Sequence, residues 1–221
     1  SSFYNKNKIL LAFLAFAAGG IGLMTAYSVG WIPFLILFVM SITGLSYNLR
    51  LIPKRFAYDK YRRLRDIPGS KTVLIAMAWG IVTSVLPQLS VSGNIHLNTA
   101  IIFLWSLSLV FVRTAFFDIL DMQGDRIIGR ETIPLIYGQK TTTRLLKRLL
   151  IGLPFFLTLS AAFSLVTSLG VALTISPLLL FIVIFIHEKR HLLPGIRLEF
   201  YVESAFILVG FITVLWILMT T

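Results

Sequence analysis

The stretch NTAIIFLWSLSLVFVRTAFF, residues 98–117, decides the class of fold, because this apolar run is long enough to cross a bilayer as one helix. Working outward from it, we find six further runs of the same character. The predicted spans are approximately Ile9–Tyr27, Trp31–Leu49, Thr72–Val91, Asn98–Phe117, Leu149–Leu169, Gly170–Ile186 and Phe200–Met219. The sequence therefore predicts an all-α integral membrane protein, a helical bundle with seven transmembrane helices.

Composition supports this class and excludes others. An average soluble domain carries roughly 25% charged residues, whereas this chain of 221 residues is 13% charged and 57% hydrophobic. These values exclude a disordered chain, a coiled coil and an ordinary soluble enzyme. The chain has no cysteine, which excludes disulfides, iron–sulfur clusters, thiol catalysis and cysteine zinc sites.

Charged residues are confined to alternate loops of the predicted bundle. Lys and Arg fall at the N-terminus, in Arg50–Lys71, Asp118–Arg148 and His187–Arg197, or just inside the adjoining helix ends. The opposite loops and the C-terminus contain no Asp, Glu, Lys or Arg. The positive-inside rule then predicts a multi-pass protein of the inner or plasma membrane with its charged loops and active site in the cytoplasm. The net charge of +11 therefore points to an anionic ligand at the membrane, and not to nucleic acid.

Three of the nine acidic residues cluster after the fourth predicted helix: Asp118, Asp121 and Asp125. Their i, i+3, i+7 spacing would place them on one face of a helix, where like charges repel and the C-terminal end of the macrodipole disfavours anions. A hard cation would relieve both penalties, and Mg²⁺ commonly completes its coordination with substrate phosphates. The alternative interpretation is a solvated acidic helix end.

The residues around this cluster carry a family resemblance. The stretch reads Asp-x-x-Asp-x-x-Gly-Asp-Arg-x-x-Gly-x-x-Thr-x-Pro over Asp118–Pro134 and resembles the second aspartate-rich motif of the UbiA superfamily of intramembrane prenyltransferases. Upstream, Ser46–Lys54 is similar to a Tyr- and Lys-containing family segment, although one proline is absent and the lysine comes one residue early. The segment Asp66–Lys71, leading into a helix with Trp79-Gly80, is also similar to the family.

The resemblance implies a UbiA-type bundle that transfers an isoprenyl or polyprenyl group from an allylic diphosphate to a small aromatic or lipid acceptor, with Mg²⁺ as cofactor. It implies Asp118, Asp121 and Asp125 as metal ligands, with Tyr47 beside them in catalysis. The candidates for diphosphate binding, by charge and position, are Asn48, Lys54, Lys71, Arg113, Arg126 and Arg130. The alternative for the cations is the positive-inside bias, which needs no substrate, and for Arg113 a side chain that reaches toward the membrane surface. The expected partners are an isoprenyl diphosphate, an acceptor of undefined identity and membrane lipid.

The resemblance also sets an expectation for the domain. The family has nine helices and a first motif of the Asn-Asp-x-x-Asp-x-x-x-Asp type, which this chain lacks. We therefore expect residues 1–221 to form a single prenyltransferase domain without its first two helices, and the first motif to lie upstream of Ser1.

Two alternative functions are also compatible with the sequence. His187-Glu188-Lys189-Arg190-His191 matches the His-Glu-x-x-His signature of zinc proteases, with Glu199 or Glu203 as a third ligand. Against this, two cations lie between the histidines and Pro194-Gly195 breaks the helix. The second alternative is a transporter or non-catalytic membrane subunit, which the missing first motif would favour and the uncharged outer loops disfavour.

Overall fold

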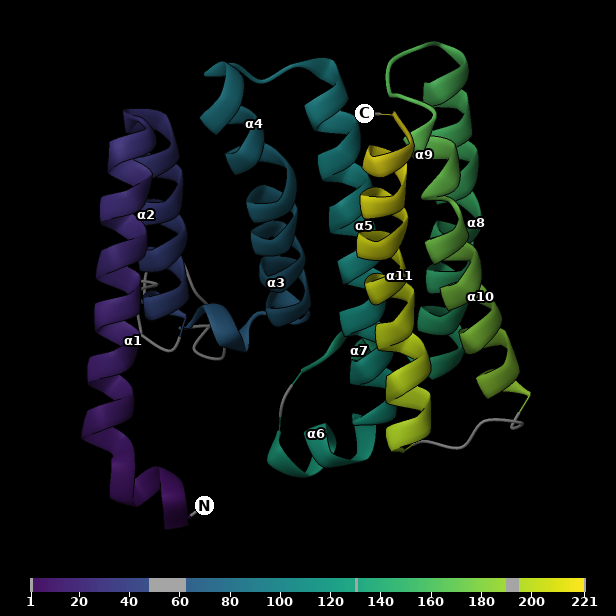
Figure 1. Cartoon of the computed structure of the whole chain (residues 1–221). Coiled ribbons are helices and arrows are strands. Elements are labelled where there is room, and N and C mark those ends of the chain that lie inside the picture. The colour runs from purple at the N-terminus through teal and green to yellow at the C-terminus, as the bar shows by residue number, and fades with distance from the viewer. Residues whose placement is uncertain (1, 48–62, 130, 190–194, 221) are drawn as a thin grey trace, which may run out of the picture. The chain divides into compact units, whose positions relative to one another are not determined.

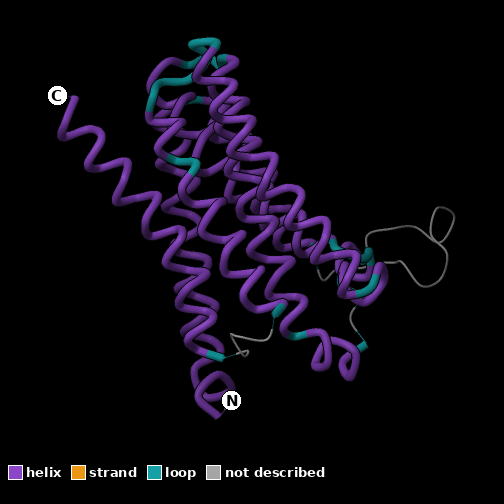
Figure 2. The backbone as a smooth tube through the Cα atoms, turned by 90° about the vertical axis from the view of Figure 1, so that its right-hand side faces the viewer, coloured by secondary structure: helices purple, strands orange, loops and turns teal. Residues whose placement is uncertain are grey.

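The computed structural model describes residues 2–47, 63–129, 131–189 and 195–220, with side chains from residue 7 onward. In these ranges every regular element is a helix, and Figures 1 and 2 show only helices and their connecting loops. The predicted all-α membrane bundle is confirmed. The elements are α1 (Ser2–Val29), α2 (Trp31–Ser46), η1 (Leu64–Asp66), α3 (Ser70–Gly80), η2 (Ile81–Val85), α4 (Leu86–Ser92), α5 (Leu97–Leu120), α6 (Met122–Ile128), α7 (Ile133–Tyr137), α8 (Gln139–Ala162), α9 (Leu169–Ala172), α10 (Ile175–Glu188) and α11 (Ile196–Thr220).

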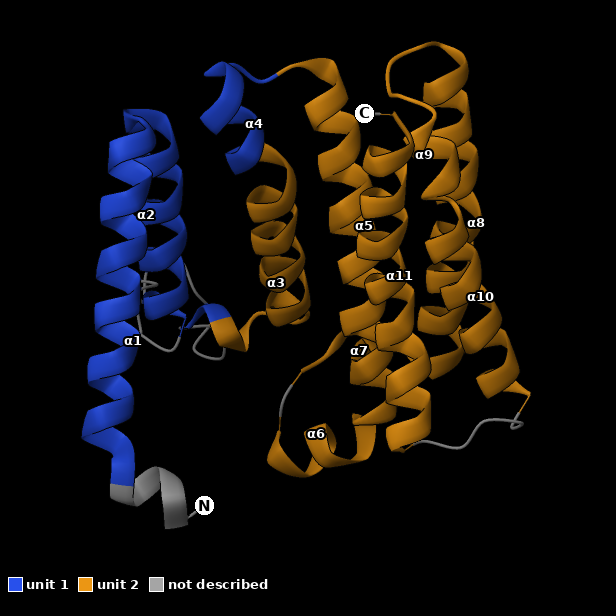
Figure 3. Cartoon of the chain, in the orientation of Figure 1, with its two compact units in different colours: residues 1–64, 86–95 blue, residues 65–85, 96–221 orange. Residues whose placement is uncertain are grey.

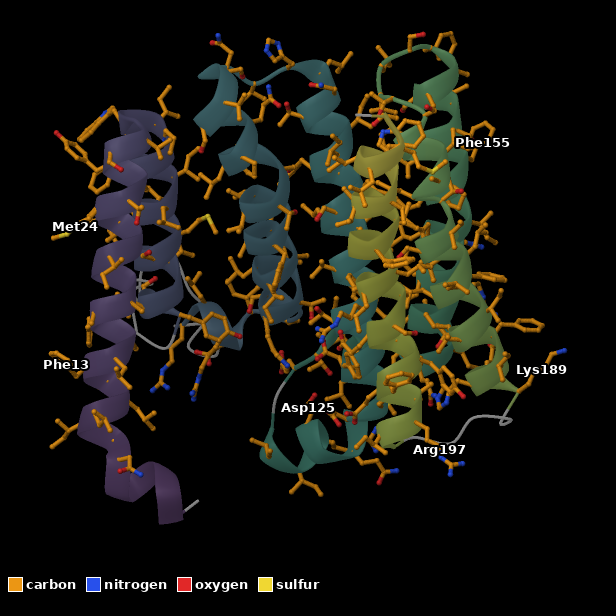
Figure 4. All side chains as sticks on the ribbon, viewed as in Figure 1. Phe13, Met24, Asp125, Phe155, Lys189 and Arg197 are labelled. Atoms are coloured by element: carbon orange, nitrogen blue, oxygen red, sulfur yellow. The ribbon has the colours of Figure 1, made fainter. Side chains whose placement is uncertain are left out.

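The chain divides into two compact units (Figure 3). Unit 1 comprises residues 1–64 and 86–95, and unit 2 comprises residues 65–85 and 96–221. Unit 1 contains the α1–α2 hairpin, whose turn carries packed aromatic rings: Tyr27, Trp31 and Phe34 lie with ring centroids 5.4–6.4 Å apart. Phe13 and Met24 project outward from α1 (Figure 4), as expected of side chains that face lipid.

Unit 2 is built around α5, which has the largest share of buried residues. Its Val112, Ala115 and Phe116 lie in a core shared with α8, α10 and α11. Helix α3 packs closely on α5 because Gly80 has no side chain: a Cβ there would lie 3.0 Å from a ring carbon of Phe103. This approach brings the N-terminal end of α3 beside the C-terminal end of α5.

The number of membrane spans agrees in part with the prediction. Six segments are long and apolar enough to cross a membrane: Asn7–Val29, Ser70–Ser92, Leu97–Leu120, Gln139–Ala162, Leu169–Glu188 and Ile196–Thr220. The remaining predicted span, Trp31–Leu49, corresponds to the shorter apolar helix α2, whose sequence continues outside the described residues. The count of seven therefore stays a prediction.

The expectation for Asp118–Arg148 as a polar loop is wrong. This stretch contains α6, α7 and the first ten residues of α8, which begins at Gln139 and not at Leu149. The cause is amphipathicity: Thr142, Leu146 and Leu150 recur every four residues and are buried, whereas Arg144 and Arg148 are exposed. A search for continuous apolar runs misses such a helix start.

Candidate active site

Charged side chains collect at one end of unit 2. In Figure 4, Asp125, Lys189 and Arg197 lie at this end, while Phe155 lies near the opposite end. The C-terminal end of α5, helices α6 and α7, and the N-terminal end of α3 all meet here.

Asp118 is the centre of the polar contacts at this end. Its residue surface is only 3% exposed, in the last turn of α5. The Thr72 hydroxyl donates a hydrogen bond to Oδ2 over 2.6 Å, and Lys71 Nζ lies 3.5 Å from Oδ1. Because both partners belong to the first turn of α3, its positive dipole end also faces the carboxylate. A buried charge requires such compensation.

The other two aspartates of the cluster differ from the predicted single helical face. Helix α5 ends at Leu120, Asp121 joins it to α6 with φ −88° and ψ 5°, and Asp125 belongs to α6. Asp121 is exposed, whereas Asp125 is 7% exposed and its charge acts on Asp118. The one-face expectation is wrong because the chain turns at Asp121.

A contact between two loops holds the start of α3 against the acidic segment. The Gly69 amide donates to the Glu131 carbonyl over 3.3 Å. Gly69 has φ +69°, and a Cβ there would lie 2.6 Å from Cγ1 of Ile133, so only glycine fits. Next to Ile133, the Thr132 hydroxyl is buried and has no hydrogen-bond partner within the described residues. The Gly69–Ile133 contact therefore fixes where Lys71 and Thr72 lie.

Arg113, which sequence reasoning assigned to diphosphate, pairs with another helix. Its Nε donates to Oε1 and Oε2 of Glu203 over 2.9 and 3.2 Å, and its terminal nitrogen also contacts Oε1. The guanidinium carbon lies 5.0 Å from the ring centroid of Phe117 and 5.9 Å from that of Phe206. The guanidinium thus joins α5 to α11.

The residues of the protease-like signature also have structural partners. Glu188 accepts a 2.6 Å hydrogen bond from Lys147 Nζ, which joins α10 to α8. His187 packs edge-on against the Phe116 ring at 5.5 Å. His191 lies outside the described residues. Glu188 and His187 therefore both make contacts between helices of unit 2.

The remaining predicted site residues are spread over both units. Arg126 is exposed on α6. Tyr47 belongs to unit 1 and caps the C-terminal end of α2. Asn48, Lys54 and Arg130 fall outside the described residues.

The donor set suits a hard cation. Within the described ranges no three Asp, Glu or His side chains lie together as a complete metal cage. Mg²⁺ does not require one, because it commonly binds one or two carboxylates and takes its other ligands from water and phosphate. Asp118 and Asp125 are the two buried carboxylates that could provide oxygen ligands, and Lys71 is half-exposed beside Asp118.

Sequence reasoning missed Thr72 and Thr132. Thr72 is a single hydroxyl at the start of an apolar helix, and only its position next to Lys71 could have marked it. Thr132 lies inside the Asp118–Pro134 motif, so the motif pointed to it without giving it a role.

Comparison with known proteins gives one match. A family model described as the UbiA prenyltransferase family matches residues 5–207. Comparisons with curated proteins and with solved structures gave no match.

Proposed function

The chain belongs to the UbiA prenyltransferase family and is a multi-pass membrane prenyltransferase, and on that premise we propose that its allylic diphosphate binds at the charged end of unit 2. The observation that carries this proposal is the buried Asp118 carboxylate held between Thr72 and Lys71. A carboxylate this deeply buried in an apolar bundle is costly, and ionisable groups inside membrane helices are typical of functional sites.

The proposed reaction breaks the bond between the allylic carbon and the diphosphate oxygen. The diphosphate leaves with the electron pair, the allylic carbon bonds to a nucleophilic atom of the acceptor, and the acceptor loses a proton. Since the leaving group is a concentrated anion, the site must supply positive charge as the bond breaks. Lys71 is half-exposed and lies beside the carboxylate, so its ammonium is available to a phosphate oxygen.

We further propose that Asp118, Asp121 and Asp125 hold Mg²⁺. When bound, Mg²⁺ would neutralise part of the charge on the departing diphosphate. The exposed Arg126 follows Asp125 in α6 and is a further cation available to the diphosphate.

Several finer assignments rest on the family resemblance and the charge distribution. We propose, from the resemblance alone, that Tyr47, Asn48, Lys54 and Arg130 also act in diphosphate binding, and that the site faces the cytoplasm. The orientation is supported by the positive-inside rule, because the charged loops all fall on one side of the predicted bundle. The acceptor is a small aromatic or lipid molecule.

A binding experiment tests this site without requiring the acceptor. A prenyl thiolodiphosphate, which is not readily cleaved, is titrated into the full chain in lipid nanodiscs with Mg²⁺. We expect Lys71→Gln to weaken binding by about 10- to 150-fold, because one charge-assisted contact is worth about 1.5–3 kcal/mol. Lys189→Gln is the matched control, an exposed lysine at the same end of unit 2. Equal affinities for wild type and Lys71→Gln would contradict the assignment.

A further inference from the structure

Thr72 bonds to a charged side chain of another helix, whereas many described hydroxyls of this chain bond to the backbone of their own helix. Thr83, Thr114 and Thr142 each donate to the carbonyl oxygen four residues earlier. Thr72 is the third residue of α3. Its hydroxyl instead donates to Asp118, 46 positions away in the sequence.

The two oxygens of Asp118 therefore have different surroundings. Oδ2 accepts the 2.6 Å hydrogen bond from Thr72, whose residue surface is 0% exposed. Oδ1 faces Lys71, whose side chain is 50% exposed. A carboxylate has about four lone-pair positions, so the Thr72 bond orients the group and leaves Oδ1 available.

We propose that Thr72 is a positioning residue for cation binding: its hydroxyl fixes the Asp118 carboxylate so that Oδ1 is turned toward Lys71 and can bind a cation there. This inference rests on the metal role of Asp118 in the proposed function. Groups that hydrogen-bond a ligating carboxylate typically contribute about 10–100-fold to metal affinity. The Gly69–Ile133 contact supports the arrangement, because it fixes the start of α3, where Thr72 lies.

The test uses Mn²⁺ alone as a spectroscopic substitute for Mg²⁺. Free Mn²⁺ is measured by electron paramagnetic resonance during titration of the full chain in nanodiscs. Thr72→Val keeps the shape and removes the hydroxyl, while Thr72→Ser keeps the hydroxyl. Thr99→Val is the matched control: Thr99 is buried and contacts a polar side chain at the opposite end of α5. We expect affinity to fall about 10–100-fold in Thr72→Val and to stay within about twofold of wild type in the other two variants.

The Mg²⁺ dependence of prenyl transfer is a second measurement, and a purely structural role of Thr72 would not change it. We expect Thr72→Val to need more Mg²⁺ for half-maximal prenyl transfer while keeping most of its kcat at saturating Mg²⁺. If Thr72→Val does not fold, Thr72→Ala takes its place. If neither folds, Thr72→Ser decides, because weak Mn²⁺ binding by a folded variant that keeps the hydroxyl overturns the inference.

The outcomes separate this inference from the function on which it rests. Wild type and Thr72→Val that bind Mn²⁺ equally would overturn the role of Thr72 and leave the proposed function intact. A wild-type protein that binds no Mn²⁺, with or without a prenyl thiolodiphosphate, would overturn the metal site itself.

Discussion

Arg113 of α5 and Glu203 of α11 form an ion pair in which one guanidinium contacts both carboxylate oxygens, with Nε 2.9 Å from Oε1 and 3.2 Å from Oε2. The two residues are 90 positions apart in sequence, and both are partly buried. A cation inside an apolar bundle requires such a partner, and the rings of Phe117 and Phe206 add favourable contacts. The pair explains why α5 carries an arginine one turn before Asp118 without assigning that arginine to substrate.

Exchanging the two charges separates the structural role from a role in diphosphate binding. Arg113→Glu and Glu203→Arg should each lower the stability of unit 2 by about 1–3 kcal/mol, because each places two like charges together. The double variant should recover most of this loss and most of the affinity for a prenyl thiolodiphosphate, measured by thermal melting and by titration in nanodiscs. Recovered stability with an affinity still reduced tenfold or more would instead assign Arg113 to the diphosphate.

Gly69→Ala should impair both folding and diphosphate binding. The left-handed backbone at φ +69° costs alanine about 1–2 kcal/mol, and the new Cβ would also press on Ile133 at 2.6 Å. Gly93→Ala is the matched control, since Gly93 has the same φ of +69° with open space around it. The difference between the two variants in melting temperature therefore isolates the packing contribution.

A second substitution tests the same contact. Gly69→Ala combined with Ile133→Ala removes the clashing Cγ1 and should recover part of the affinity for the prenyl thiolodiphosphate. Identical behaviour of Gly69→Ala and Gly93→Ala in both assays would show that the Gly69–Ile133 contact does not position the start of α3.

His187 and His191 should be dispensable for prenyl transfer. Replacing both with Ala should cost about 1 kcal/mol of stability, because His187 loses its edge-on contact with Phe116. Prenyl transfer should persist, and elemental analysis should find no stoichiometric zinc in the wild-type protein. Stoichiometric zinc that disappears in the double variant, together with a lost peptidase activity, would favour the protease interpretation.

The spans and the acidic motif could be predicted because each is local in the sequence. The run at residues 98–117 lies within α5 at Leu97–Leu120, and the motif begins where that helix ends. The break at Asp121 could not be predicted, because no Gly or Pro interrupts the sequence before Gly124. The start of α8 was missed because its cations hide the apolar face that carries Leu146 and Leu150.

The features that could not be predicted depend on contacts between residues far apart in the sequence. The sequence places Thr72 next to Lys71 but gives no sign that its hydroxyl reaches Asp118. The Ile-Pro-Gly segment before α3 is typical of a turn, yet only the packing of Ile133 shows why Gly69 must have no side chain. From the sequence, Arg113 is a candidate for substrate binding, and only the structure shows that it pairs with Glu203.

The acidic segment is tested most sharply by replacing one carboxylate with its amide. Asp118→Asn keeps an oxygen that can accept the Thr72 hydrogen bond, so the variant should fold, with unchanged or slightly higher stability in the absence of metal, because a buried charge is removed. Asp121→Asn removes an exposed charge of the same cluster, so it should change the stability without metal less than Asp118→Asn does. Glu199→Gln, an exposed acid in the first turn of α11, is the control.

The decisive measurement is prenyl transfer by wild type and Asp118→Asn as a function of Mg²⁺ concentration, with thermal melting of the same samples. We predict at least about a 100-fold loss of kcat/KM in Asp118→Asn, since metal-assisted stabilisation of a leaving group contributes several kcal/mol. Glu199→Gln should match wild type. A folded Asp118→Asn protein with near wild-type turnover and unchanged Mg²⁺ dependence would contradict the metal and diphosphate site at the charged end of unit 2.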